Sequence, residues 1–100
     1  MQLEFSKIIN INNILVKNRS TTYSFTNQYT LQKSFDGTNW TDFYKGKTTN
    51  YTALSTWTMF SGSVMIPKYL RIQSTGTYGE GYACIGFLTI DANLVCTIKI

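Results

Sequence analysis

Acidic side chains are the first candidates for chemistry in this sequence, because it contains no histidine. Without an imidazole, the commonest general base and metal ligand is missing, and a serine or cysteine nucleophile lacks its usual partner. The acids are Glu4, Asp36, Asp42, Glu80 and Asp91. A glycosidase needs two facing carboxylates, and nothing in the sequence pairs these acids. We therefore expect no enzyme, no catalytic residue, no metal site and no cofactor, and no glycine-rich phosphate loop or zinc-ligand spacing contradicts this.

The thiols of Cys84 and Cys96 are the other reactive groups. If residues 82–90 and 94–100 form a hairpin that turns near 91–93, Cys96 lies opposite Phe87 or Leu88. Cys84 would then be too distant for a disulfide. We expect buried free thiols, which suits a reducing compartment or a particle assembled in the cytoplasm.

Composition indicates a single all-β domain that spans residues 1–100. The chain is long enough to bury one core, and its 15% aromatic content, many threonines and single proline favour strands. No window shows the apolar stripe of an amphipathic helix. The net charge is +4, but the basic residues are scattered and only Lys45-Gly46-Lys47 is locally dense. A nucleic-acid partner would usually require a basic cluster, so none is expected.

The central element is a hairpin over residues 29–43. Tyr29, Leu31 and Lys33 alternate with polar residues, as in a half-buried strand. Asp36-Gly37 then predicts a tight turn, because glycine accepts positive φ and aspartate can bond its own backbone. A second strand begins at Trp40.

The rest of the chain predicts further short strands separated by turns. Strands are expected over residues 2–5, 7–17, 53–60, 64–66, 69–73, 82–90 and 94–100, and turns or loops over 17–22, 45–52, 61–63, 74–81 and 91–93. Asn10, Asn12 and Asn13 interrupt the second strand, where we expect a bulge or an exposed edge. Such spacing is typical of an antiparallel β-sandwich or jelly roll. Leu31, Trp40, Trp57, Leu70 and Ile72 are the predicted core residues, while Arg71 is expected to form a structural bridge.

Three motifs in order resemble discoidin domains, the coagulation-factor C-type modules of the galactose-binding-like superfamily. The run L-Q-K-S-F-D-G-T-N-W-T at residues 31–41 is similar to the family's central hairpin, and P-K-Y-L-R-I at residues 67–72 to a later strand. Q-L-E-F at residues 2–5 is a weaker match. The resemblance implies a jelly-roll sandwich, shortened at its N-terminus. It leaves a sheet edge near residues 2–17 uncovered, unless a C-terminal strand fills that position.

The resemblance also implies a ligand site at one end of the sandwich, formed by two loops. The residues at the matching positions are Arg19, Ser20, Thr21, Thr22 and Tyr23 in the first loop, and Tyr78, Glu80, Gly81 and Tyr82 in the second. Hydroxyl groups, a guanidinium and tyrosine rings suit a shallow glycan or protein site. An ordinary solvated turn is the alternative for the threonine-rich loop.

Two classes of function follow from these observations. The first is a small structural subunit of a phage or virus particle or another surface assembly, which self-associates or docks on other proteins, with Tyr78 and Tyr82 as candidate contacts. The second is a stand-alone carbohydrate-binding adhesion module. The first residues do not resemble a secretory signal and no apolar run is long enough to span a membrane, which favours a protein assembled in the cytoplasm or in a virion. Glycosylation-type triplets at Asn18, Asn39 and Asn50 are interpreted as a consequence of composition.

Overall fold

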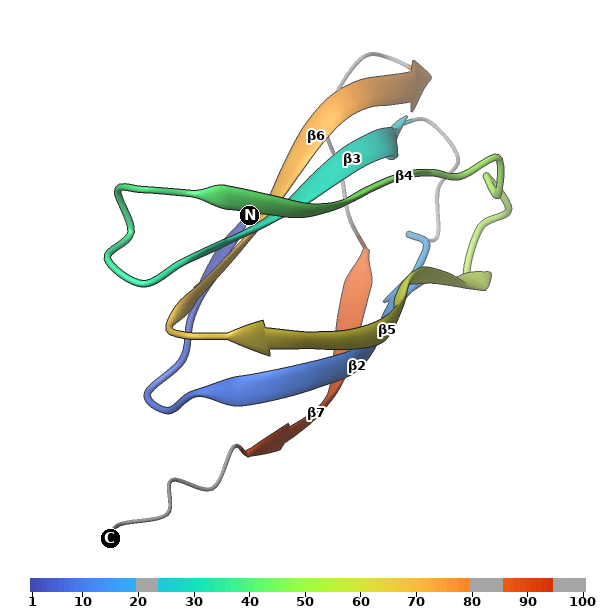
Figure 1. The fold of residues 1–100 in the computed structure, drawn as a ribbon. Helices are drawn as coiled ribbons and strands as arrows, with labels where there is room; N and C mark the ends of the chain where they lie inside the picture. The colour runs from blue at the N-terminus through green and yellow to red at the C-terminus, as the bar shows by residue number, and fades with distance from the viewer. Residues whose placement is uncertain (20–23, 80–85, 95–100) are drawn as a thin grey trace, which may run out of the picture.

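A computed structural model of the protein describes residues 1–19, 24–79 and 86–94. These residues form the strands β1 (Gln2–Glu4), β2 (Ile9–Lys17), β3 (Ser24–Ser34), β4 (Thr41–Lys47), β5 (Thr56–Ile66), β6 (Tyr69–Gly79) and β7 (Phe87–Leu94). All pairings are antiparallel and make two sheets, β1-β6-β3-β4 and β5-β2-β7 (Figure 1). The predicted all-β sandwich is confirmed. No helix that could cross a membrane occurs in the described part of the chain.

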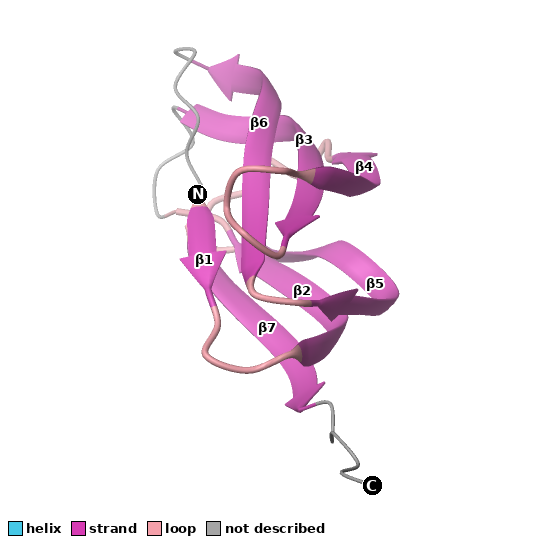
Figure 2. Ribbon diagram, turned by 60° about the vertical axis from the view of Figure 1, so that its left-hand side comes forward, coloured by secondary structure: helices cyan, strands magenta, loops and turns pink. Residues whose placement is uncertain are grey.

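The chain passes back and forth between the two sheets. Every connection except the β3–β4 hairpin crosses from one sheet to the other, so the layers are interlaced rather than formed from separate halves of the sequence (Figure 2). The apolar face of each sheet is buried against the other, as sandwich packing requires.

The core consists of side chains that alternate along the central strands of both sheets. Leu31, Leu70 and Ile72 are buried as predicted. Around them lie the other buried apolar residues: Ile9, Ile11, Ile14, Val16, Tyr29, Met59, Phe60 and Ile66. Trp57 is partly buried and packs against this cluster, whereas Trp40 does not belong to it.

The predicted hairpin turn is held by the Asp36 carboxylate. Its Oδ1 accepts hydrogen bonds from the backbone N–H groups of Thr38 and Asn39, both at 2.8 Å, and from the Ser34 hydroxyl at 3.0 Å. These bonds, the backbone ones first, hold the pKa of Asp36 well below its ordinary value. Gly37 has φ +79°, which explains why the turn uses glycine there.

Three predicted turns are wrong, because the chain continues through them as strand. Residues 61–63 lie within β5, residues 74–79 within β6 and residues 91–93 within β7. In β5, the Gly62–Ser63 step faces the single residue Asn12 of β2, since Asn13 pairs with Ser61 and Ile11 with Val64. The glycine signal therefore marks a β-bulge, in which two residues oppose one.

In β6, the glycine signal at Gly76 also marks a β-bulge rather than a turn. Gln28 pairs with Gly76 and Tyr29 with Ser74, which leaves Thr75 as the additional residue. The remaining part of the predicted loop, residues 80–81, lies outside the described residues.

The turn predicted at residues 91–93 fails for a different reason. Asp91, Ala92 and Asn93 pair with β2, and the Asn13 amide donates to the Asp91 carboxylate at 3.3 Å. A strand pair with its own cross-strand hydrogen bond thus replaces the turn. A hairpin that turns at 91–93 is thereby excluded, and Cys84 and Cys96 lie outside the described residues.

Strand β2 has the bulge that its asparagines predict, but it is not an edge. The register with β7 passes from Ile11↔Ala92 to Asn13↔Asp91, so Asn12 has no partner in β7. β5 and β7 flank β2 on both sides, so the sheet position beside β2 is filled, by residues 87–94. Across β2 and β5, the Asn10 amide also donates to the Ser63 hydroxyl at 3.0 Å.

Tyr29 connects the two sheets through a buried hydrogen bond. Its hydroxyl donates to the backbone carbonyl of Met59 in β5 at 2.6 Å. Ile14 pairs with Phe60 and Leu15 with Thr58, so Met59 is the unpaired residue of a bulge and its carbonyl is available for this bond. Burial, with a smaller contribution from the neighbouring Tyr44, raises the pKa of Tyr29 to about 12.

Replacing Tyr29 by phenylalanine should therefore destabilise the fold and change its response to alkali. Leaving the buried carbonyl of Met59 without a donor costs about 1–3 kcal/mol. Because the pKa of Tyr29 is raised in the folded state, its contribution is fully present below pH 10 and is lost as the pH rises toward 12. Urea unfolding from pH 8 to 11.5 should show the gap between wild type and Y29F narrowing over this range. Y69F is the control and should follow wild type, because the Tyr69 hydroxyl makes no hydrogen bond within the described residues; a constant gap would contradict the assignment.

Candidate functional site

The two loops predicted to carry a ligand site adjoin strand ends that lie next to each other. Ser24, at the start of β3, pairs with Gly79, at the end of β6. β2 ends nearby at Lys17, and the connection between β4 and β5, residues 48–55, reaches the same end of the sandwich, at the right of Figure 1. We call this region the loop end.

Most of the predicted site residues cannot be placed at the loop end. Ser20, Thr21, Thr22, Tyr23, Glu80, Gly81 and Tyr82 lie outside the described residues. Of Tyr78 only the backbone is described, and it pairs with Phe25. Arg19 follows β2, and its carbonyl accepts a hydrogen bond from the Leu54 N–H at 3.1 Å. What the structure adds to this end is the connection 48–55. The sequence predicted a loop over 45–52 and a strand from residue 53, but β4 continues to Lys47 and β5 begins only at Thr56, so both bounds were wrong.

Asn18 organises that connection. Its side chain is buried, and its amide nitrogen donates to the carbonyls of Asn50 at 2.9 Å and Thr52 at 3.1 Å. Its amide oxygen accepts from the Trp57 indole at 2.9 Å, and its backbone N–H donates to Ser55. Asn18 thus holds the middle and the second end of the connection from the inside. The Asn-Arg-Ser triplet that contains Asn18 is explained by this buried role, which the sequence pattern alone could not reveal.

Leu54 is the unusual residue of the connection. Its φ is 60°, a left-handed conformation that is sterically unfavourable for a side chain such as leucine. The hydrogen bond to Arg19 and the bonds made by Asn18 hold the backbone in this state. The side chain is 55% exposed. The loop end therefore presents an apolar side chain to solvent on a strained but well-supported backbone.

A second polar cluster lies on the outer face of the four-stranded sheet. The Arg71 Nε donates to the Gln32 amide oxygen at 2.7 Å, and the Gln32 amide nitrogen donates to Asp42 at 2.6 Å. The guanidinium carbon of Arg71 lies 4.0 Å from the centre of the Trp40 ring. We call these four residues the outer-face network. Arg71 is thus the structural bridge that was predicted.

The prediction that Trp40 belongs to the core is wrong. Trp40 lies before β4 and packs against Arg71 and Tyr69, the latter at a ring-centre distance of 6.3 Å. Its aromatic ring is attracted by the guanidinium, a cation–π contact, rather than by the apolar interior. Sequence periodicity could not show this, because the residues that separate Trp40 from Leu31 include the turn.

The acids in the described residues have structural partners or lie apart from one another. Asp36 holds the turn, Asp42 accepts from Gln32, and Asp91 accepts from Asn13. Within the described ranges, no three side chains of the types that ligate metals come together.

The contact between Arg71 and Trp40 predicts a measurable coupling. A double-mutant cycle with Arg71→Met and Trp40→Leu, followed by urea unfolding, should give an interaction energy of about 0.5–2 kcal/mol, as expected for a partly desolvated cation–π pair. The same cycle with Phe35→Leu in place of Trp40→Leu is the control, because Phe35 is 75% exposed in the turn. Additive effects for the Arg71–Trp40 pair would contradict the arrangement.

In comparisons with known proteins, the chain matches no protein-family model, no curated protein and no solved structure. The strand pairings establish its fold class, which is two antiparallel sheets packed as a sandwich.

Proposed function

We propose that this chain is a non-catalytic binding and structural module, a small subunit of a phage or virus particle or of another surface assembly, which contacts a glycan or a protein through its loop end. Leu54 carries the proposal. A strained backbone and an exposed apolar side chain are both unfavourable for the isolated protein. Their maintenance by Asn18 and Arg19 is explained if Leu54 contacts a partner.

The chemistry of the chain supports a role in binding rather than catalysis. It has no histidine, and three of its acids hold a turn, the outer-face network and a strand pair. The apolar Leu54 beside polar loops matches the composition of an interface, in which an apolar centre is surrounded by polar groups.

We also propose that the sandwich is discoidin-like. The three sequence motifs occur in the order found in that family. The two stronger motifs also fold in a compatible way: the first as strand, turn and strand, the second as a strand with Leu70 and Ile72 inside. In this proposal the loop end corresponds to the ligand end of the family, and the connection 48–55 contributes Leu54 to it.

The test uses the variant Leu54→Gly, which removes the side chain and relieves the strain. Glycine accepts positive φ without steric cost, so the variant should be at least about as stable as wild type in urea unfolding. Sedimentation velocity at micromolar concentration should show that wild type self-associates, or a glycan array should show that it retains a glycan. Whichever of these interactions wild type shows, its affinity should be about tenfold or more weaker in L54G.

Phe35→Ser provides the matched control, because Phe35 is also an exposed apolar residue but lies in the β3–β4 turn. It should leave both measurements unchanged. Wild-type protein that stays monomeric and binds no glycan, or equal losses in the two variants, would refute the role of the loop end. If a strictly monomeric protein retains a defined glycan, the assignment as an assembly subunit would be wrong and the protein would be a stand-alone lectin.

A further inference from the structure

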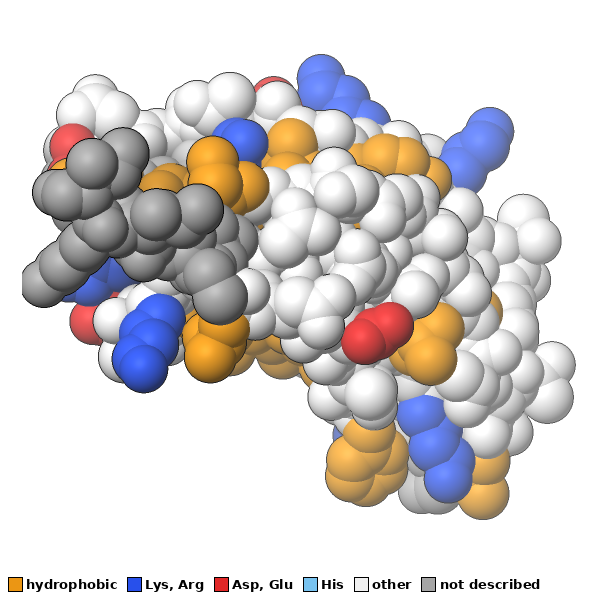
Figure 3. Space-filling view, turned by 60° about the horizontal axis from the view of Figure 1, so that its bottom comes forward, with side chains coloured by type: hydrophobic (Ala, Val, Ile, Leu, Met, Phe, Trp, Pro, Cys, Tyr) orange, Lys and Arg blue, Asp and Glu red, His pale blue; other side chains and the backbone are white. Residues whose placement is uncertain are grey.

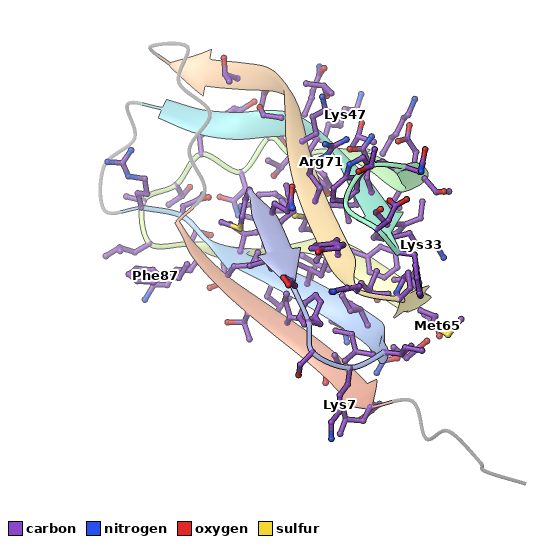
Figure 4. The ribbon with its side chains drawn as sticks, turned by 90° about the vertical axis from the view of Figure 1, so that its left-hand side faces the viewer. Lys7, Lys33, Lys47, Met65, Arg71 and Phe87 are labelled. Atoms are coloured by element: carbon purple, nitrogen blue, oxygen red, sulfur yellow. The ribbon has the colours of Figure 1, made fainter. Side chains whose placement is uncertain are left out.

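A shallow groove lies on the outer face of the four-stranded sheet, away from the loop-end contact proposed above. It encloses about 430 Å³ and is lined by Gln28 and Thr30 of β3, Lys45 and Lys47 of β4 and Thr75 of β6, with Tyr29 and Gly46 between them. Figure 4 shows the labelled Lys47 and Arg71 on the side of this sheet that faces away from β2, β5 and β7.

Strand register explains why these side chains share one face. Tyr29 pairs with Gly46, and the Tyr29 side chain points into the core. A Cβ at Gly46 would overlap the Tyr29 hydroxyl, so Gly46 faces the core side as well. Their neighbours in β3 and β4 must then point outward, because side chains alternate along a strand. This places Gln28 and Thr30 opposite Lys47 and Lys45.

The sheet is irregular beside the groove. The pairing of β3 with β6 shifts on both sides of Gln28, which leaves Asn27 and Thr75 as bulged residues. Bulges bend a strand and redirect its side chains, and they occur frequently next to binding sites. Here they bring the Thr75 hydroxyl from β6 to the same groove as the two lysines of β4.

The side chains of the two lysines are available to a ligand. Lys45 and Lys47 are exposed, and within the described residues neither ammonium group makes a hydrogen bond or ion pair. Their Cα atoms lie about 7 Å apart, two residues along one strand. Asp42, the acid on the same strand, is engaged by Gln32 at 2.6 Å. Two positive charges thus stand over a groove that also offers an amide and hydroxyl groups.

We propose that this groove binds an anionic polysaccharide, with Lys45 and Lys47 pairing with its carboxylate or sulfate groups and Gln28 and Thr75 bonding neighbouring sugar hydroxyls. Ammonium groups form charge-assisted hydrogen bonds with such anions. The mixture of cations with uncharged donors and acceptors fits a ligand that carries both acids and hydroxyls.

Other anionic macromolecules fit the groove less well. Single-stranded nucleic acid requires exposed aromatic rings for base stacking, and the aromatic residue at this groove, Tyr29, is only 2% exposed. An acidic peptide that adds a strand requires a free sheet edge. The edge of this sheet at the groove is β4, and a strand added there would lie beyond β4. The groove instead lies over the face shared by β3, β4 and β6, so an added strand would not occupy it.

The test compares immobilised polygalacturonate, which carries carboxylates, heparin, which carries sulfates, and dextran, which is neutral. Wild-type protein should bind at least one anionic polymer at 150 mM salt and not dextran; the polymer bound more tightly identifies the anionic group. Lys45→Gln with Lys47→Gln should weaken this binding by about tenfold or more. Gln28→Ala, which leaves the charge unchanged, should weaken it by about threefold.

The matched control is Lys7→Gln with Lys68→Gln, which makes the same change in net charge. These lysines are also exposed and also line a surface groove, together with Glu4 and Phe5 at the β1–β2 and β5–β6 connections. Equal weakening by the two double variants would overturn the proposal, as would binding to dextran alone or tighter binding of single-stranded DNA through the same lysines. Leu54→Gly should bind the polysaccharide as tightly as wild type does. The proposal for the groove and the proposal for the loop end are therefore tested independently of each other. The unfolding midpoint of the Lys45 and Lys47 variant should match wild type, because both lysines are exposed. That of the control should fall slightly, because the Lys68 ammonium lies 5.5 Å from the centre of the Tyr69 ring.

Discussion

The hydrogen bond from the Tyr29 hydroxyl to the Met59 carbonyl is the interaction on which the arrangement of the two sheets depends. It is a buried polar contact between β3 and β5, strands of different sheets. Its existence requires a bulge in β5, which leaves the Met59 carbonyl outside the ladder, and a glycine at position 46, which leaves room for the Tyr29 ring. The ring also packs against Trp57 at 5.9 Å. A polar bond in the core specifies one registration of the layers, whereas apolar packing alone tolerates several.

The outer faces of the two sheets are stabilised differently from their interior. On the three-stranded sheet, amides and hydroxyls pair across strands, and in Figure 3 the apolar side chains of the visible described surface stand as separate spots among polar atoms. On the four-stranded sheet, the outer-face network joins β3, β4 and β6 through Gln32, Asp42 and Arg71. At the turn end, Lys33 reaches the Met65 carbonyl at 3.3 Å and forms a further link between the sheets (Figure 4).

Local sequence signals predicted the features that depend on few residues. The β3–β4 hairpin, the bulge in β2 and the inward side chains of β6 follow from alternation and from the chemistry of Asp36-Gly37. Glycine at positions 62 and 76 was misinterpreted, because a turn and a bulge have the same local composition and differ only in the partner strand. Asn18, Leu54 and the stacked Trp40 could not be found, since their roles depend on residues 30 or more positions away in the sequence. Of the predicted site, the convergence of β3 and β6 is visible, and most of its side chains lie outside the described ranges.

The position of β2 has a consequence for the order in which the protein can form. Its two partners are residues 56–66 and 87–94, so β2 leaves the ribosome long before either neighbour has been synthesised. Its row of isoleucines and valine cannot be enclosed until β7 follows, and no early segment can complete a sheet by itself. Pairings between residues this distant carry a large loop-closure entropy and slow the folding of β proteins to about milliseconds or longer. The sandwich can therefore be completed only after residues 87–94 have been synthesised, and until then β2 has an unpaired side on which it could pair with another molecule.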